Sequence, residues 1–132
     1  MNEADLALFL DSFESCIQDD RFLRVFYDTF LASSEEVRAM FAKTDFGLQR
    51  RSLRASLYVM VAASARHEAE LSTLSELAER HRALHIKPEH YDLWMQSLLS
   101  AVAQCTKRFD ANVARVWREA FRSGINYMKA SA

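Results

Sequence analysis

The sequence predicts an all-α domain, and three observations lead to that prediction. Half of the 132 residues are hydrophobic, which supplies a substantial core for a chain of this length. Only two glycines and one proline are present, so there is little turn chemistry for a sheet. Apolar residues recur at the three- and four-residue spacing of an amphipathic helix along most of the chain. We therefore expect about seven helices, no strand and a single domain over residues 1–132.

Helix-start signals divide the first part of the chain into three expected helices. Asn2 can cap the first helix, and Asp19 and Asp20 separate it from the second. Ser33 and Glu36 have the spacing of a capping box, which predicts that a third helix begins at this serine. The expected helices are 3–18, 21–32 and a short segment ending near Met40 and Phe41, followed by a polar loop over 42–47.

The second part of the chain is expected to hold four more helices. The first covers about 48–66, and a polar loop is expected over 67–72. Thr73 and Glu76 repeat the capping-box spacing ahead of the helix that carries His81. Pro88 suits the first turn of the next helix, where its missing N–H costs no hydrogen bond. After a break at 107–109, Asp110 can cap the last helix.

Charge and cysteine usage narrow the class of protein. The net charge of -1 gives no sign imbalance that would favour nucleic acid or an anionic membrane as a partner. No apolar run approaches the roughly 18 residues of a membrane span, and the acidic N-terminus is not typical of a secretory signal. Cys16 and Cys105 stand outside any CxxC pattern and are interpreted as buried thiols of a reducing compartment. We expect a cytoplasmic protein.

Among the four histidines, His81 is the candidate metal or cofactor ligand. It continues an apolar helical stripe, and the carbonyl of Leu77 one turn earlier can accept a hydrogen bond from its second ring nitrogen. A histidine in such a stripe can equally be a core residue, and spacing alone leaves both interpretations open. His85 could join His81 in a zinc pair, but the sequence offers no compelling third ligand. His90, at the start of the next helix, is expected to be exposed.

The spacing of three residues around His81 resembles the globin family. In many globins the proximal haem ligand is followed seven residues later by proline and ten residues later by tyrosine, which here are Pro88 and Tyr91. The segment from Leu77 to His81 is similar to the end of the globin F helix. The segment IKPEHY, Ile86 to Tyr91, is similar to bacterial single-domain globins and the haem domain of flavohaemoglobins. The resemblance covers nearly the whole chain and implies a globin fold around a haem pocket.

The resemblance also implies roles for individual residues. His81 matches the proximal iron ligand, and Phe41 matches the phenylalanine packed on the haem face. Tyr27, fourteen residues before Phe41, takes the distal position of the B helix, and Gln49 takes that of the E helix. On pattern alone Tyr27 could instead be a core tyrosine and Gln49 a surface residue. The further haem contacts that the resemblance implies are Leu53, Leu77, His85, Tyr91, Trp94 and Leu98.

Three features depart from the family pattern. Glu35 replaces a proline common early in the C helix, and the loop between Phe41 and Gln49 is short. Flavohaemoglobins also use a late carboxylate that acts with the tyrosine matching Tyr91 to polarise the proximal histidine. This sequence has no Asp or Glu after Glu119, so that relay is expected to be incomplete.

These residues imply a haem protein that reversibly binds dioxygen, and also nitric oxide and carbon monoxide. Tyr27 and Gln49 would donate hydrogen bonds to the gas ligand, because dioxygen that draws electron density from ferrous iron becomes a better acceptor. One alternative is a nitric oxide dioxygenase that works with a separate reductase, since these residues contain no flavin or nicotinamide domain. Another is a gas sensor module that passes its signal to a partner.

Overall fold

The computed structural model describes the backbone of residues 1–64 and 68–130 and the side chains of residues 1–61 and 75–130. Within these ranges there are seven helices and no strand, which confirms the all-α prediction. The helices are α1 (Glu3–Gln18), α2 (Phe22–Ser33), α3 (Glu35–Met40), α4 (Phe46–Ser64), α5 (Glu68–Ala83), α6 (Pro88–Cys105) and α7 (Ala111–Ala130).

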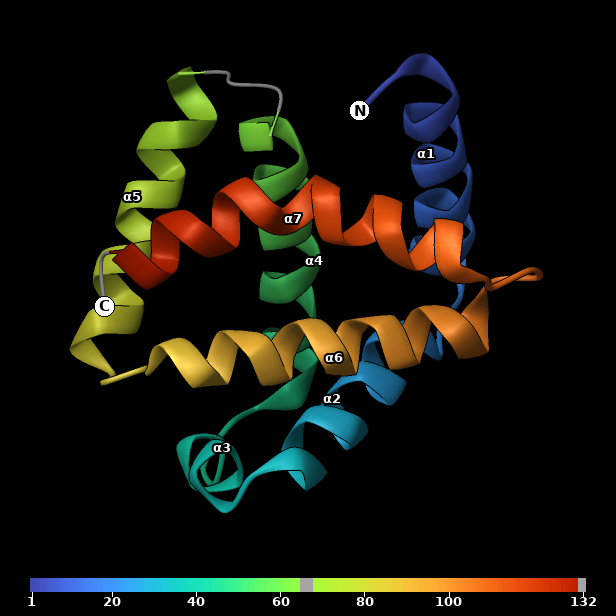
Figure 1. Ribbon diagram of the computed structural model, residues 1–132. Helices are drawn as coiled ribbons and strands as arrows, with labels where there is room; N and C mark the ends of the chain where they lie inside the picture. Colours follow the sequence, from blue (N-terminus) through green and yellow to red (C-terminus); the bar gives the residue numbers. More distant parts are fainter. Residues whose placement is uncertain (65–67, 131–132) are drawn as a thin grey trace.

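The long C-terminal helices form the centre of the fold (Figure 1). α6 and α7 lie side by side and run in opposite directions, joined by a short turn. α7 also contacts α1, α4 and α5, while α2 packs along α6 and carries α3 at its far end. At the crossing of α4 and α7, Gly124 allows a close approach, because a Cβ atom there would lie 2.9 Å from Cε of Met60. No helix among the described residues is both long and apolar enough to cross a membrane.

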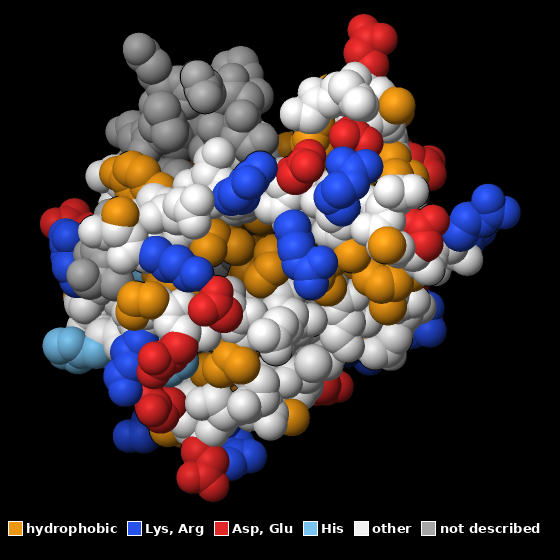
Figure 2. All heavy atoms as spheres, in the orientation of Figure 1, with side chains coloured by type: hydrophobic (Ala, Val, Ile, Leu, Met, Phe, Trp, Pro, Cys, Tyr) orange, Lys and Arg blue, Asp and Glu red, His pale blue; other side chains and the backbone are white. Residues whose placement is uncertain are grey.

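The core between α1, α2 and α7 is built around Trp117. Its ring lies 5.2 Å from that of Phe9, 6.1 Å from that of Phe22 and 5.7 Å from that of Phe121, measured between centroids. The indole N–H donates to Oγ of the buried Ser12 at 2.8 Å. Large aromatic side chains therefore fill this part of the interior. On the face drawn in Figure 2, acidic and basic side chains of the described residues are interspersed.

Several predicted helix boundaries are confirmed by hydrogen bonds. Oδ1 of Asn2 accepts from the N–H of Asp5 at 2.8 Å, and Oδ1 of Asp110 accepts from the N–H of Val113 at 2.9 Å. Pro88 occupies the first turn of α6, as its missing N–H predicts. Short polar side chains at these starts satisfy N–H groups that have no partner inside the helix.

The predicted start of the third helix is wrong by one residue. α2 continues through Ser33, whose hydroxyl donates to the carbonyl of Phe30 at 2.6 Å. Ser34 instead has extended backbone angles, and its Oγ accepts from the N–H of Val37 at 3.4 Å. Two adjacent serines offer the same capping chemistry, and only the end of the preceding helix decides which one is free to cap.

Two predicted polar loops are shorter than expected. α4 begins at Phe46, inside the loop predicted over 42–47, because Oδ1 of Asp45 accepts from the N–H groups of Gly47 and Leu48 at 2.9 and 3.3 Å. α5 begins at Glu68, so most of the loop predicted over 67–72 is helical and Thr73 does not start a helix. Polar residues such as glutamate are good helix formers, and polarity alone does not mark a loop. Residue 67 lies outside the described residues.

Candidate functional site

His81 lies in the last turn of α5 with a half-buried side chain. Its Nδ1 is 3.1 Å from the hydroxyl of Tyr91, which α6 presents from its first turns. The carbonyl of Leu77 was expected to be the hydrogen-bond partner of this ring nitrogen, but its partner is the Tyr91 hydroxyl. A partner on a neighbouring helix restrains the imidazole ring more than one on its own helix would, since it ties α5 to α6.

The surroundings of His81 favour the form of imidazole that binds a metal. Burial lowers the pKa of His81, and the positive charge of Arg80 lowers it further. The ring is therefore neutral at neutral pH, which is the form that ligates. With Nδ1 engaged by Tyr91, Nε2 is the nitrogen left to bind a metal, and a hydrogen-bonded second nitrogen is the usual state of a ligating histidine.

Tyr27 and Gln49 come together from two helices although they are 22 residues apart in the sequence. Nε2 of Gln49 donates a hydrogen bond to the hydroxyl oxygen of Tyr27 at 3.1 Å. Tyr27 is only 4% exposed, and burial raises its pKa to about 12, while the Gln49 hydrogen bond acts in the opposite direction. The hydroxyl therefore keeps its proton at neutral pH. Because the oxygen is used as an acceptor, that proton is available for another partner.

Phenylalanine rings surround the Tyr27 side chain. The ring of Phe41 lies 5.8 Å from it and the ring of Phe46 lies 5.5 Å from it, with 6.0 Å between the two phenylalanines. Phe46 was missed by the sequence reasoning, which placed it in a polar loop. The signal available was a large aromatic residue directly after Asp45, a residue type that begins helices. These rings give the Tyr27 hydroxyl an apolar environment.

The remaining predicted residues divide between core and surface. Leu53 and Leu98 are buried, and Leu77 is partly buried and packed against the core. Trp94 is partly buried, and its ring lies 5.8 Å from that of Phe26. His85 is exposed beyond the end of α5 in a left-handed backbone conformation, with φ of 59°, so it does not share a helical face with His81. The structure thus assembles one pair at His81 and Tyr91 and a second group around Tyr27.

The all-α arrangement of the described helices, with a histidine at the end of α5 that meets a tyrosine of α6, fits the globin class of proteins. The sequence profile of that class, described as Globin, matches residues 24–128. This chain belongs to the globin family.

Individual relatives agree with this assignment. A protein of Pseudomonas aeruginosa PAO1, whose crystal structure is described as highly homologous to a human hemoglobin, superposes with a TM-score of 0.90. It is 36% identical, and the match covers 96% of this chain and 97% of that one. Flavohemoproteins of Halalkalibacterium halodurans and Deinococcus radiodurans are 31% and 35% identical over 73% and 61% of this chain. The matched parts are only 24% and 20% of those two proteins.

Membership of the globin family implies a haem cofactor and the binding of diatomic gases. The residues present fit that cofactor. His81 offers one neutral nitrogen while the other is hydrogen-bonded to Tyr91, which is the arrangement an axial ligand requires. The aromatic group of Tyr27, Phe41 and Phe46 offers apolar rings and one hydroxyl donor.

Proposed function

We propose that this chain reversibly binds dioxygen, and also nitric oxide and carbon monoxide, at haem whose iron is held by His81. The observation that carries the proposal is the hydrogen bond from Gln49 to Tyr27, because it leaves the Tyr27 proton as a donor for the gas ligand. Haem, when bound, would supply an iron that can take a small gas molecule as a ligand. Two hydrogen-bonded pairs support this proposal: His81 with Tyr91 for the proximal side of the haem, and Tyr27 with Gln49 for the distal side.

The proximal pair would orient the axial ligand. If Nε2 of His81 held the iron, Nδ1 would carry the proton and donate to the Tyr91 oxygen, 3.1 Å away. Burial raises the pKa of Tyr91 to about 12, so Tyr91 stays a neutral acceptor at neutral pH. A neutral acceptor fixes the ring without drawing the proton fully away from the imidazole.

The distal pair would stabilise the gas ligand. Gln49 donates to the Tyr27 oxygen, and a hydroxyl that accepts one hydrogen bond becomes a better donor of another. The rings of Phe41 and Phe46 keep water away from this hydroxyl, which strengthens the interaction. Leu53, buried one turn after Gln49 on α4, would add to the apolar wall.

A second candidate is nitric oxide dioxygenation, in which dioxygen and nitric oxide combine to give nitrate with the help of a separate reductase. The similarity to two flavohemoproteins favours this candidate. Nitrate formation separates the two functions. Many nitrates per haem in the presence of a flavin reductase would support the enzyme, and one nitrate per haem would support the binding protein.

The test of the proximal assignment uses the absorption spectrum. The purified protein should give a Soret band on haem addition, and His81→Gly should alter the band of an axially ligated haem. Free imidazole added to His81→Gly should restore the wild-type spectrum, because the small ligand can replace the missing side chain. The matched control is Glu79→Ala, a change at an exposed residue of the same helix, which should leave the Soret band unchanged. A wild-type spectrum in His81→Gly without imidazole would refute the assignment.

A further inference from the structure

A buried histidine outside the proposed haem contacts connects α3 to the beginning of α6. His90 was expected to be exposed, and it is only 3% exposed. Its Nδ1 accepts from the backbone N–H of Lys87 at 3.0 Å, and its Nε2 lies 3.4 Å from a carboxylate oxygen of Glu36. Nζ of Lys87 lies 2.9 Å from the same oxygen. The prediction failed because the partner of the imidazole, Glu36, comes from a distant part of the sequence.

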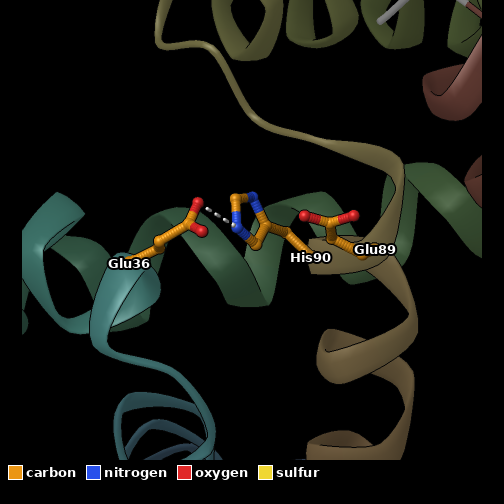
Figure 3. Close-up of side chains that lie close together, drawn as sticks. All are labelled: Glu36, Glu89 and His90. Carbon is orange, nitrogen blue, oxygen red and sulfur yellow. Dashed lines mark ion pairs between the residues drawn. The ribbon is translucent and has the colours of Figure 1, made fainter.

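Figure 3 shows part of this cluster of Glu36, Lys87 and His90: Glu36 reaches from α3 toward the His90 imidazole, and Glu89 lies beside it. Glu36, Glu89 and His90 each place a possible metal-ligand atom within 4.8 Å of the others. The hydrogen bonds do not suit a metal ion, however. Because Nδ1 accepts from Lys87, the proton of the neutral ring is on Nε2, which therefore has no lone pair for a metal. The Lys87 ammonium group already balances the Glu36 charge and lowers the pKa of that carboxyl.

The cluster acts instead on the backbone that leads from His81 to Tyr91. The carbonyl of His81 accepts from the N–H groups of Leu84 and Ile86 at 3.1 and 3.2 Å, which folds the chain back directly after α5. The next residue is Lys87, whose N–H and ammonium group are both held by the cluster. Tyr91 follows His90 in the first turns of α6, so the direction of its side chain depends on how that start is held.

We infer that His90, Glu36 and Lys87 form a latch that positions the Tyr91 hydroxyl against Nδ1 of His81. His90 is thus a positioning residue for the proximal histidine, and it acts through Tyr91. Glu36 lies five residues before Phe41, so the latch also ties the start of α6 to the helix that leads into the aromatic group.

The inference rests on the proposed role of His81 and is tested by the iron–histidine stretching band in the Raman spectrum of the haem-loaded ferrous protein. This band reports the hydrogen bond at Nδ1 and not gas binding. Tyr91→Phe removes that bond and should shift the band. His90→Leu should shift it in the same direction. His90→Gln should keep the wild-type band, because the glutamine amide has an acceptor for the Lys87 N–H and a donor for Glu36.

Asp92→Asn is the matched control. It removes an ion pair with Lys129, 2.7 Å long, at the residue next to Tyr91, and it should leave the band unchanged. If His90→Leu does not fold, Glu36→Ala tests the inference in its place. Glu36 is exposed, and its removal takes away the ion-pair partner of both His90 and Lys87. A shift in that variant supports the latch.

Three outcomes would overturn the inference, and they differ from one another. A wild-type band in His90→Leu or Glu36→Ala, together with a shift in Tyr91→Phe, removes the latch and leaves the proposed proximal site intact. A shift in His90→Leu that His90→Gln does not reverse assigns the effect to lost packing. Absence of the band from the wild-type protein, or no shift in Tyr91→Phe, contradicts the proposed proximal pair itself.

Discussion

Replacing Tyr27 with phenylalanine should accelerate dioxygen dissociation strongly. The substitution removes one hydroxyl from a side chain that is 4% exposed and keeps the ring that packs against Phe41 and Phe46. A hydrogen bond to a charged partner contributes roughly 1.5–3 kcal/mol. Since about 1.4 kcal/mol corresponds to a tenfold change, the rate should rise roughly tenfold to a hundredfold. Gln49 also loses the oxygen to which it donates.

The rate is measured by stopped-flow mixing of the oxygenated protein with excess carbon monoxide. The control is Tyr58→Phe on α4, whose side chain is 49% exposed and should not affect the rate. Gln49→Leu should also accelerate dissociation, and the double variant should be less than additive, because the two side chains share one hydrogen bond. An unchanged rate in Tyr27→Phe would refute the reasoning, and full additivity would refute the coupling of the pair.

Two predictions concern stability. Burial raises the pKa of Tyr27 from 10.0 to about 12. The protonated side chain therefore contributes fully to the free energy of unfolding below pH 10, and this contribution is lost as pH rises toward 12. At about 1.4 kcal/mol per pKa unit this loss is roughly 2–3 kcal/mol. In denaturant unfolding, the free energy of unfolding of Tyr27→Phe should fall less steeply with alkaline pH than that of the wild type. Equal slopes would contradict the argument from burial. Ser12→Ala leaves the buried Trp117 N–H without its acceptor and should cost about 1–3 kcal/mol of unfolding free energy. Ser56→Ala, which breaks an exposed hydrogen bond within α4, should cost much less, and equal costs would refute the role of burial.

Local signals in the sequence predicted the helices well. Asn2, Asp110 and Pro88 act at helix starts as expected, because each satisfies or avoids an N–H within its own turn. Such effects involve residues a few positions apart, and a single sequence contains them completely. The polar segments were less informative, since Phe46 and Glu68 already lie in helices. Helix formation there depends on caps and propensities that a count of polar residues ignores.

Contacts between helices were harder to predict. His90 was expected to be exposed, but it is buried and lies 3.4 Å from a carboxylate oxygen of Glu36 on α3. Nδ1 of His81 was expected to donate to the carbonyl of Leu77, and its partner is Tyr91 on α6. Periodicity indicates which side of a helix is apolar but not how that helix is rotated against its neighbours. The partner of a polar atom between two helices is set by that rotation.

The sequence by itself determined the all-α class, the position of most helix starts and the resemblance to globins, because these depend on spacing along the chain. The spacing of His81, Pro88 and Tyr91 is enough to identify His81 as the candidate ligand. Only the tertiary structure decided which atoms meet there. It brings the Tyr91 hydroxyl to 3.1 Å from Nδ1 of His81 and places Gln49 on the Tyr27 oxygen, because helix packing, and not sequence spacing, brings together side chains from different helices.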